Sequence, residues 1–181
     1  MKTKLFLFAA ALFFSAVEVN AQDATMPVNS ETKLIDYTEV VTMSGIKKDE
    51  LYKRGLAWFS KNYKNPAAVI KKQSPEEGII EGIHLIKVYN TDKEGKKLQA
   101  GEIGYTITIL FKDDKYKYSI TKLNQKGASY KAIEPWMDKS AKGYLPVYGE
   151  HLKQVDEFAK NLVNEIKKGM NDAGAVKKSD F

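Results

Sequence analysis

The sequence predicts an α+β fold of two layers, in which an antiparallel sheet of about five strands carries two helices on one face. Two segments, one near each end of the domain, have a single apolar stripe at helical spacing. A segment rich in β-branched residues precedes the first helix, and four further strand-like segments separated by turns follow it. The expected order is therefore strand, helix, four strands, helix, in one domain over residues 35–170.

The first helix is expected between Lys47 and Tyr63, with Ser44 as its N-cap. Leu51, Trp58 and Phe59 recur at helical spacing and define an apolar face. The opposite side carries a basic set: Lys47, Lys48, Lys53, Arg54, Lys61 and Lys64. Because aromatic and basic residues occupy different sides, we expect Trp58 and Phe59 to anchor the helix in the core and not to form a binding patch.

The sequence defines some of the expected strands more clearly than others. A first strand is expected over residues 35–43, before the helix, and a short one over residues 67–73, after it. The next runs from Gly78 to Asn90, where Gly82 indicates a bulge or a close approach of another chain segment. The polar stretch 91–101 is expected to be a hairpin loop.

The segments 104–112 and 115–121 form the clearest hairpin, with Asp113-Asp114 as a two-residue loop. That loop pairs an apolar face residue by residue: Phe111 with Tyr116, Ile109 with Tyr118 and Ile107 with Ile120. The other face pairs Leu110 with Lys117, Thr108 with Ser119 and Thr106 with Thr121. One apolar and one mostly polar face predict a sheet that is covered on one side only.

A loop of about 25 residues leads to the last helix, expected from Gly149 to about Met170. Residues 22–34 are expected to be a flexible leader and residues 171–181 a disordered tail. Residues 1–21 have the pattern of a signal peptide: Lys2 and Lys4, an apolar run of about ten residues, and small residues before a cleavage site between Ala21 and Gln22. The chain has no cysteine, which excludes a lipoprotein anchor and disulfides. We therefore expect a soluble exported protein, periplasmic or extracellular, that does not span the membrane after cleavage.

The net charge of +6 falls to +5 once Lys2, Lys4 and Glu18 are removed with the leader. The lysines are dispersed among acids, with no block of like charge, and an exported chain meets anionic lipid and acidic glycans first. We therefore expect no nucleic-acid partner. The partner is expected to be an envelope protein, a glycan or a lipid.

No catalytic or metal-binding pattern is visible. His84 and His151 have no spaced ligand partners, and no serine lies in a nucleophile-elbow motif. We predict a protein without cofactor, metal or catalytic residues, although an active site assembled from distant residues stays open.

Two functional hypotheses follow. The first is a binding or adaptor module of the cell envelope, whose contact surface is the polar sheet face with Thr106, Thr108, Lys117, Ser119 and Thr121. The alternative is a carrier of a small apolar or amphipathic ligand between helix and sheet. Its cavity would be lined by five aromatic residues near the long loop: Tyr116, Tyr118, Trp136, Tyr144 and Tyr148.

The stretch VVTMSGIKKDELYKRGLAWF, followed by a Gly-Ile-Ile-Glu-Gly strand, resembles a domain family of unknown function in exported Bacteroidetes proteins. The resemblance depends most on Gly45, the run 48–52, Trp58-Phe59 and the segment 78–82. It extends over about residues 36–125. The resemblance implies a TATA-binding-protein-like fold. It implies no catalytic residue, because the matching motifs carry no assigned role.

Overall fold

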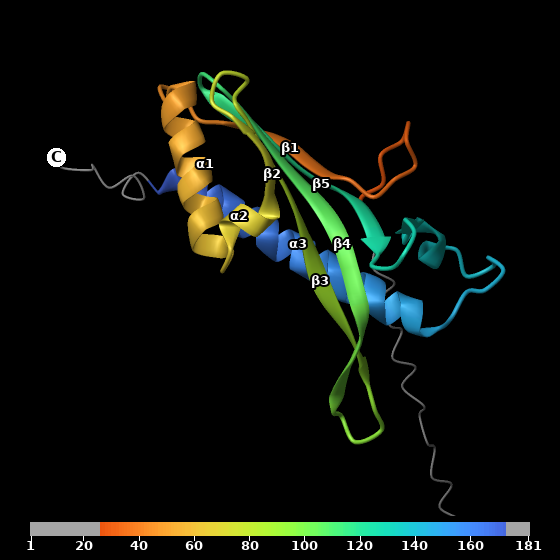
Figure 1. Ribbon diagram of the computed structural model, residues 1–181. Helices are drawn as coiled ribbons and strands as arrows, with labels where there is room; N and C mark the ends of the chain where they lie inside the picture. Colours follow the sequence, from red (N-terminus) through yellow and green to blue (C-terminus); the bar gives the residue numbers. More distant parts are fainter. Residues whose placement is uncertain (1–25, 173–181) are drawn as a thin grey trace, which may run out of the picture.

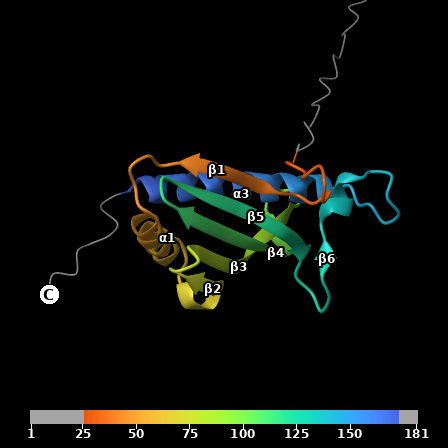
Figure 2. The same ribbon diagram turned by 90° about the horizontal axis from the view of Figure 1, so that it is seen from above.

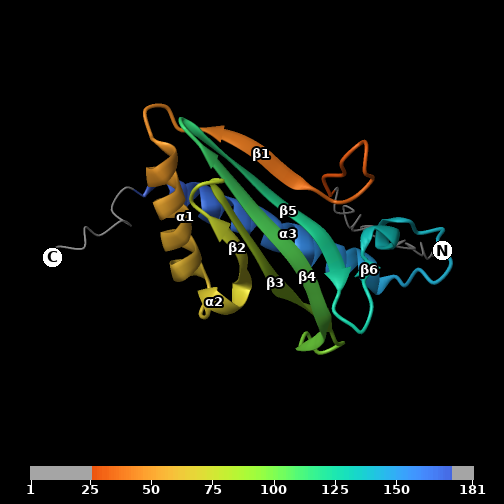
Figure 3. The same ribbon diagram turned by 45° about the horizontal axis from the view of Figure 1, so that its top comes forward.

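The computed structural model describes residues 26–172 and has the predicted α+β architecture. Its sheet has the strand order β1-β5-β4-β3-β2, all antiparallel, with β6 added to β5 (Figure 3). The strands are β1 (Tyr37–Thr42), β2 (Ile70–Ser74), β3 (Ile79–Thr91), β4 (Lys97–Lys112), β5 (Lys115–Gln125) and β6 (Lys131–Ala132). The helices are α1 (Lys48–Asn62), α2 (Pro66–Val69), the 3₁₀ helix η1 (Glu134–Met137) and α3 (Val147–Asn171).

Both long helices pack on the same sheet face. On β4, the side chains that alternate toward this face are Ile107, Ile109 and Phe111, and all three are buried. The α1 residue Gly55 lies directly against the ring of Phe111, and the α3 residue Phe158 packs on Tyr105, two positions before Ile107. We call this the helix face and the opposite side the open face. In Figure 3 α3 runs behind the sheet, and no helix crosses in front of β4 and β5.

The predicted register of the β4–β5 hairpin is confirmed at every pair, from Lys112 opposite Lys115 to Thr106 opposite Thr121.

The two turn residues of this hairpin also accept hydrogen bonds from the chain at and just before the start of α1. Asp113 accepts a hydrogen bond from the backbone N–H of Lys48 (2.8 Å), and Asp114 accepts one from the N–H of Gly45 (2.7 Å). Ser44 is therefore not the cap of α1. The N-cap position is Lys47, and a distant hairpin supplies the acceptor.

The backbone hydrogen bond from Lys48 is the main cause that lowers the pKa of the Asp113 carboxyl below its usual value, and the side-chain hydrogen bond from Lys47 is the second cause. A lowered pKa stabilises the fold above the pKa of the unfolded state, about 4, and this stabilisation is lost as the pH falls through the folded value. Asp113→Asn should therefore be less stable than the natural chain at pH 7, and the difference should shrink below pH ~4. Urea midpoints across pH 3–7 measure this. Glu94→Gln, in the exposed β3–β4 loop, is the control, and a pH-independent difference would contradict the assignment.

Arg54 corrects the prediction that it lies on the charged outer side of α1. Its side chain is buried, with the residue only 7% exposed. The expected pair with Glu50 forms (Nε to Oε1, 2.9 Å), and Nη1 also donates to the backbone carbonyl of Met170 at 2.9 Å. Arg54 thus ties α1 to the last turn of α3, a long-range contact that helical spacing cannot reveal.

Two segments differ from expectation. Residues 67–73 are not one strand: Pro66–Val69 form a helical turn, whose amide at Ala68 donates to the Asn65 side chain, and only then does β2 begin. The stretch 91–101 is mostly strand, because β3 continues to Thr91 and β4 starts at Lys97. The resulting arm extends beyond α3 (Figure 1). At its base the Gln154 side chain donates to and accepts from the backbone of Tyr89.

The expected irregularity at Gly82 is present, with the register shift on its partner strand β2, between Ile70 and Lys72. A Cβ at Gly82 would meet the side chains of Phe59 and Val69 at 3.0 and 3.1 Å, so α1 and α2 approach the sheet closely here.

The ends of the domain also shift. The described part of the expected flexible leader packs on the domain, since Met26 is buried and Val28 pairs with Ile35 in an isolated bridge. Asn171 belongs to α3 and not to a tail. The expected signal peptide and cleavage site, and residues 173–181, lie outside the described residues. Within residues 26–172, none of the helices has the length and apolarity needed to cross a bilayer.

Candidate functional site

The open face brings the five predicted contact residues together. Thr106 is opposite Thr121, Thr108 is opposite Ser119, and Lys117 is opposite Leu110. They occupy neighbouring positions on β4 and β5, the central strands of the sheet. Thr106 corrects the prediction in one respect: it is only 6% exposed and cannot be a contact residue. Thr108 is partly exposed and donates to Glu81 of β3 at 3.2 Å.

Apolar residues on the open face were missed by the sequence prediction. Val40 of β1 is 56% exposed, Ile83 of β3 is 46% exposed and Leu110 of β4 is 39% exposed. Val40 and Leu110 lie on either side of Lys117 in the same cross-strand row. The signal was present in the sequence, since β1 and β3 have β-branched or aliphatic residues at consecutive positions. Such runs do not say which face is covered.

Three lysines lie at the end of the open face beside the β4–β5 turn. Lys112, Lys115 and Lys117 are all exposed, and Lys112 is directly opposite Lys115. Among residues 26–172 no ion pair involves any of the three. The neighbouring acids Asp113 and Asp114 are engaged with the start of α1. Like charges directly across a strand pair repel, so this end of the face is a locally uncompensated cationic patch.

The acids of the open face are held at other positions. Glu81 accepts the Thr108 hydroxyl, and Glu102 pairs with Lys126 at 2.6 Å. That hydrogen bond lowers the pKa of Glu102.

We call Val40, Leu110, Lys112, Lys115 and Lys117 the basic-apolar patch.

The five aromatic residues of the carrier hypothesis are not brought together. Tyr116 and Tyr118 are buried on the helix face of β5, where the Tyr118 hydroxyl donates to Glu39 at 2.7 Å and Lys167 lies over its ring. Burial is the main cause that raises the pKa of Tyr116 to about 12.

Trp136, Tyr144 and Tyr148 form a separate group near the start of α3, at the end of the molecule opposite α1 (Figure 2). The Trp136 and Tyr148 rings stack with centroids 4.5 Å apart, and Tyr144 packs edge-on to Tyr148. Tyr148 and Lys167 are 19 positions apart on α3, which corresponds to roughly 28 Å along the helix. The set therefore does not line one cavity, and the rings of Trp136, Tyr144 and Tyr148 pack on one another.

Both histidines contact neighbouring side chains, but only His151 is buried, and His84 is exposed. His151 is buried and shares a hydrogen bond with Asn90 (2.8 Å). His84 contacts the Tyr63 and Tyr105 rings edge-on, and the two tyrosine hydroxyls are 3.0 Å apart. Partial desolvation lowers the pKa of the His84 imidazole, and burial lowers that of His151. Among the described residues, no three His, Asp or Glu side chains are grouped so that they could hold a metal ion.

Comparison with known proteins identifies the fold but no activity. Two solved structures each have a TM-score of 0.64 over 81% of this chain. One is a DUF4468 family protein from Bacteroides ovatus, at 12% identity over 90% of its length. The other is a TBP-like protein from Parabacteroides distasonis, at 16% identity over 97% of its length. No protein in the curated set matches. The model of a domain of unknown function with TBP-like fold matches residues 37–126, from the start of β1 to just past the end of β5, so the chain contains a DUF4468 domain.

Proposed function

We propose that this chain is an exported, non-catalytic binding module of the bacterial cell envelope, and that the open face of its sheet is the contact surface. The proposal is supported by the basic-apolar patch. It has exposed aliphatic side chains next to three lysines that form no ion pair within residues 26–172, on the sheet face opposite the two long helices. Exposed apolar groups on a soluble domain are usually isolated, and a cluster with adjoining charge is typical of an interaction site.

The chemistry of the patch selects an anionic partner that also offers apolar groups. An acidic envelope protein, an acidic glycan and an anionic lipid surface share the negative charge, and the protein and the lipid add the apolar groups. Lys112 and Lys115 repel each other in the free protein, and an anion placed between them removes that repulsion. Binding is therefore expected to weaken as salt is added, because the lysines remain exposed.

Charge reversal at the patch tests this proposal. The variant Lys112→Glu, Lys115→Glu, Lys117→Glu should lower binding to native envelope membranes at least tenfold in a co-sedimentation assay at low salt. The control reverses three other exposed lysines, Lys53, Lys64 and Lys153, and so has the same net charge. It should bind within about twofold of the natural chain. Equal losses in both variants would show that only net charge matters and would contradict a defined contact surface.

A second variant tests the centre of the open face without changing the lysines. Thr108→Glu with Ser119→Glu places two bulky acids beside the patch, and it should abolish binding while the far-UV spectrum stays unchanged. Unchanged capture of the partner would show that this part of the face is not in contact. Extraction of the bound material with protease, or with detergent, assigns it to protein or to lipid.

The export part of the proposal has its own measurement. Expression of residues 1–181 in a native host should give a mature chain that begins at Gln22, which the intact mass shows directly. A chain that retains residues 1–21 in the envelope would contradict cleavage and would leave the apolar run as an anchor.

A further inference from the structure

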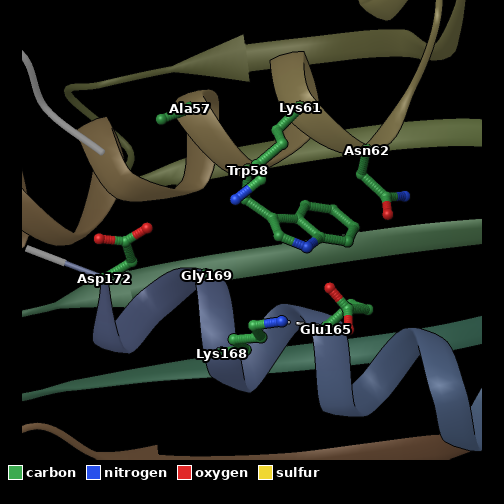
Figure 4. A pocket seen from close by; sticks show the side chains of 8 residues that line it. All are labelled: Ala57, Trp58, Lys61, Asn62, Glu165, Lys168, Gly169 and Asp172. Atoms are coloured by element: carbon green, nitrogen blue, oxygen red, sulfur yellow. Dashed lines mark ion pairs between the residues drawn. The ribbon is translucent and has the colours of Figure 1, made fainter. Parts of the chain in front are cut away.

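A cavity of about 210 Å³ lies between α1 and α3, apart from the open face and from the aromatic residues of the carrier hypothesis. Its α1 wall includes Ala57, Trp58 and Lys61, and its α3 wall includes Glu165, Lys168 and Gly169 (Figure 4). The cavity is more enclosed than the depressions along β1 and along β2. About seven water molecules would fill it at liquid density, so it suits a ligand smaller than the drug-sized molecules of typical pockets.

Trp58 is held in a fixed orientation at this cavity. Its ring packs edge-on to Phe59 (4.9 Å between centroids) and Tyr63 (5.8 Å). On the other side α3 approaches so closely that a Cβ at Gly169 would lie 2.5 Å from Cδ1 of the indole. Glycine has a low helix propensity, and at position 169, in the last turn of α3, it permits the contact with Trp58.

The indole nitrogen of Trp58 is buried and has no hydrogen-bond partner among the residues described. An indole N–H is a donor only, so it needs an acceptor. A buried donor without a partner has lost its hydrogen bond to water and has formed none within the protein to replace it. Figure 4 shows this nitrogen on the edge of the ring that faces α3, toward Glu165 and Lys168.

Two lysines border the same cavity. Lys168 is separated from Glu165 by 4.0 Å, and both side chains are mostly exposed, so this ion pair is weak. Lys61 lies on the α1 wall and forms no ion pair within residues 26–172. Two acids, Glu165 and Asp172, border the cavity as well, and the two helix C-termini that end here add partial negative charge, so the lysines offset only part of the negative charge around it. A donor without an acceptor and a weakly held ammonium group therefore face one small cavity.

We propose that this cavity binds a small carboxylate with a short apolar body. The carboxylate accepts hydrogen bonds from the Trp58 indole and the Lys168 ammonium group, and the apolar body lies against Ala57 and the indole ring. An α-amino acid has the same carboxylate and adds an ammonium group that donates a hydrogen bond to the Glu165 carboxylate. This site is independent of the proposed contact surface, because it shares no residue with the open face.

The test follows the two indole N–H resonances in a ¹H–¹⁵N spectrum of the full chain, with Trp58 assigned by its loss in Trp58→Phe. Isovalerate and leucine are the carboxylate probes, and 3-methylbutanol is the matched probe without a carboxylate. The Trp58 resonance should shift and saturate with either carboxylate and not with the alcohol. The resonance of Trp136, at the far end of α3, should stay in place.

Two variants locate the site. Lys168→Gln should weaken binding at least tenfold, whereas Lys153→Gln, another exposed lysine on α3, should change it less than twofold. Ala57→Leu fills the cavity and should abolish the shift without loss of charge. The proposal is overturned if neither carboxylate gives a saturable shift, if 3-methylbutanol binds equally well, or if the two lysine variants weaken binding to the same extent.

Discussion

Phe111→Ala is expected to lower the free energy of unfolding by about 3–5 kcal/mol, the range for truncation of a buried aromatic side chain. Phe111 is almost fully buried on the helix face of β4. Its ring packs edge-on to Tyr52 (5.6 Å) and lies against Gly55, so it is one of the points where α1 contacts the sheet. Neighbouring atoms cannot fill the space, because both sides belong to regular elements.

Leu110→Ala is the matched control, one position earlier on the same strand. Leu110 points to the open face and is 39% exposed, so its truncation should cost less than ~1 kcal/mol. Urea unfolding of both variants measures the difference. Similar losses at the two positions would contradict the assignment of the two sheet faces, on which the contact surface depends.

Gly78→Ala is expected to cost about 3 kcal/mol, from backbone strain and a clash combined. Gly78 has φ +64°, and a Cβ there would lie 2.5 Å from the carbonyl oxygen of Phe111. The Gly78 carbonyl also accepts the Phe111 N–H at 2.7 Å, so the two backbones are fixed against each other. No side-chain rotation can relieve this contact.

Gly95→Ala separates the two contributions. Gly95 also has a left-handed backbone, with φ +82°, but nothing lies within 4 Å of a Cβ built on it. Its substitution should cost only the strain, about 1–2 kcal/mol. Equal thermal midpoint losses for the two alanine variants would show that the approach of Gly78 to Phe111 is not tight.

The elements that could be predicted are those whose information is local. The β4–β5 register followed from a two-residue turn and a strict alternation, and α1 followed from its apolar stripe. The α1 cap could not be predicted, because the acceptor on Asp113 is 65 residues from Lys48. Arg54 was misplaced for the same reason: its burial depends on a carbonyl of α3 that is 116 residues away.

The candidate site was predicted in part. The polar residues of the open face follow from the hairpin alternation, and they are neighbours in the structure. The exposed Val40 and Ile83 did not follow, because aliphatic residues on both faces of β1 and β3 leave their orientation undetermined until the neighbouring strands are known. The aromatic set was grouped by closeness to the long loop, and the loop turns back over one end of α3 only.

The TBP-like fold itself assigns no partner, since one fold supports many functions. The contact surface must therefore be located by an experiment that detects direct contact with the partner. The most direct measurement is photocrosslinking in native cells, with the reactive group placed either at Leu110 on the open face or at Lys153 on α3. We predict a defined adduct from position 110 that disappears when Lys112, Lys115 and Lys117 are changed to Glu, and none from position 153. Adducts from position 153 alone, or the same adducts from both positions, would contradict the open face as the contact surface.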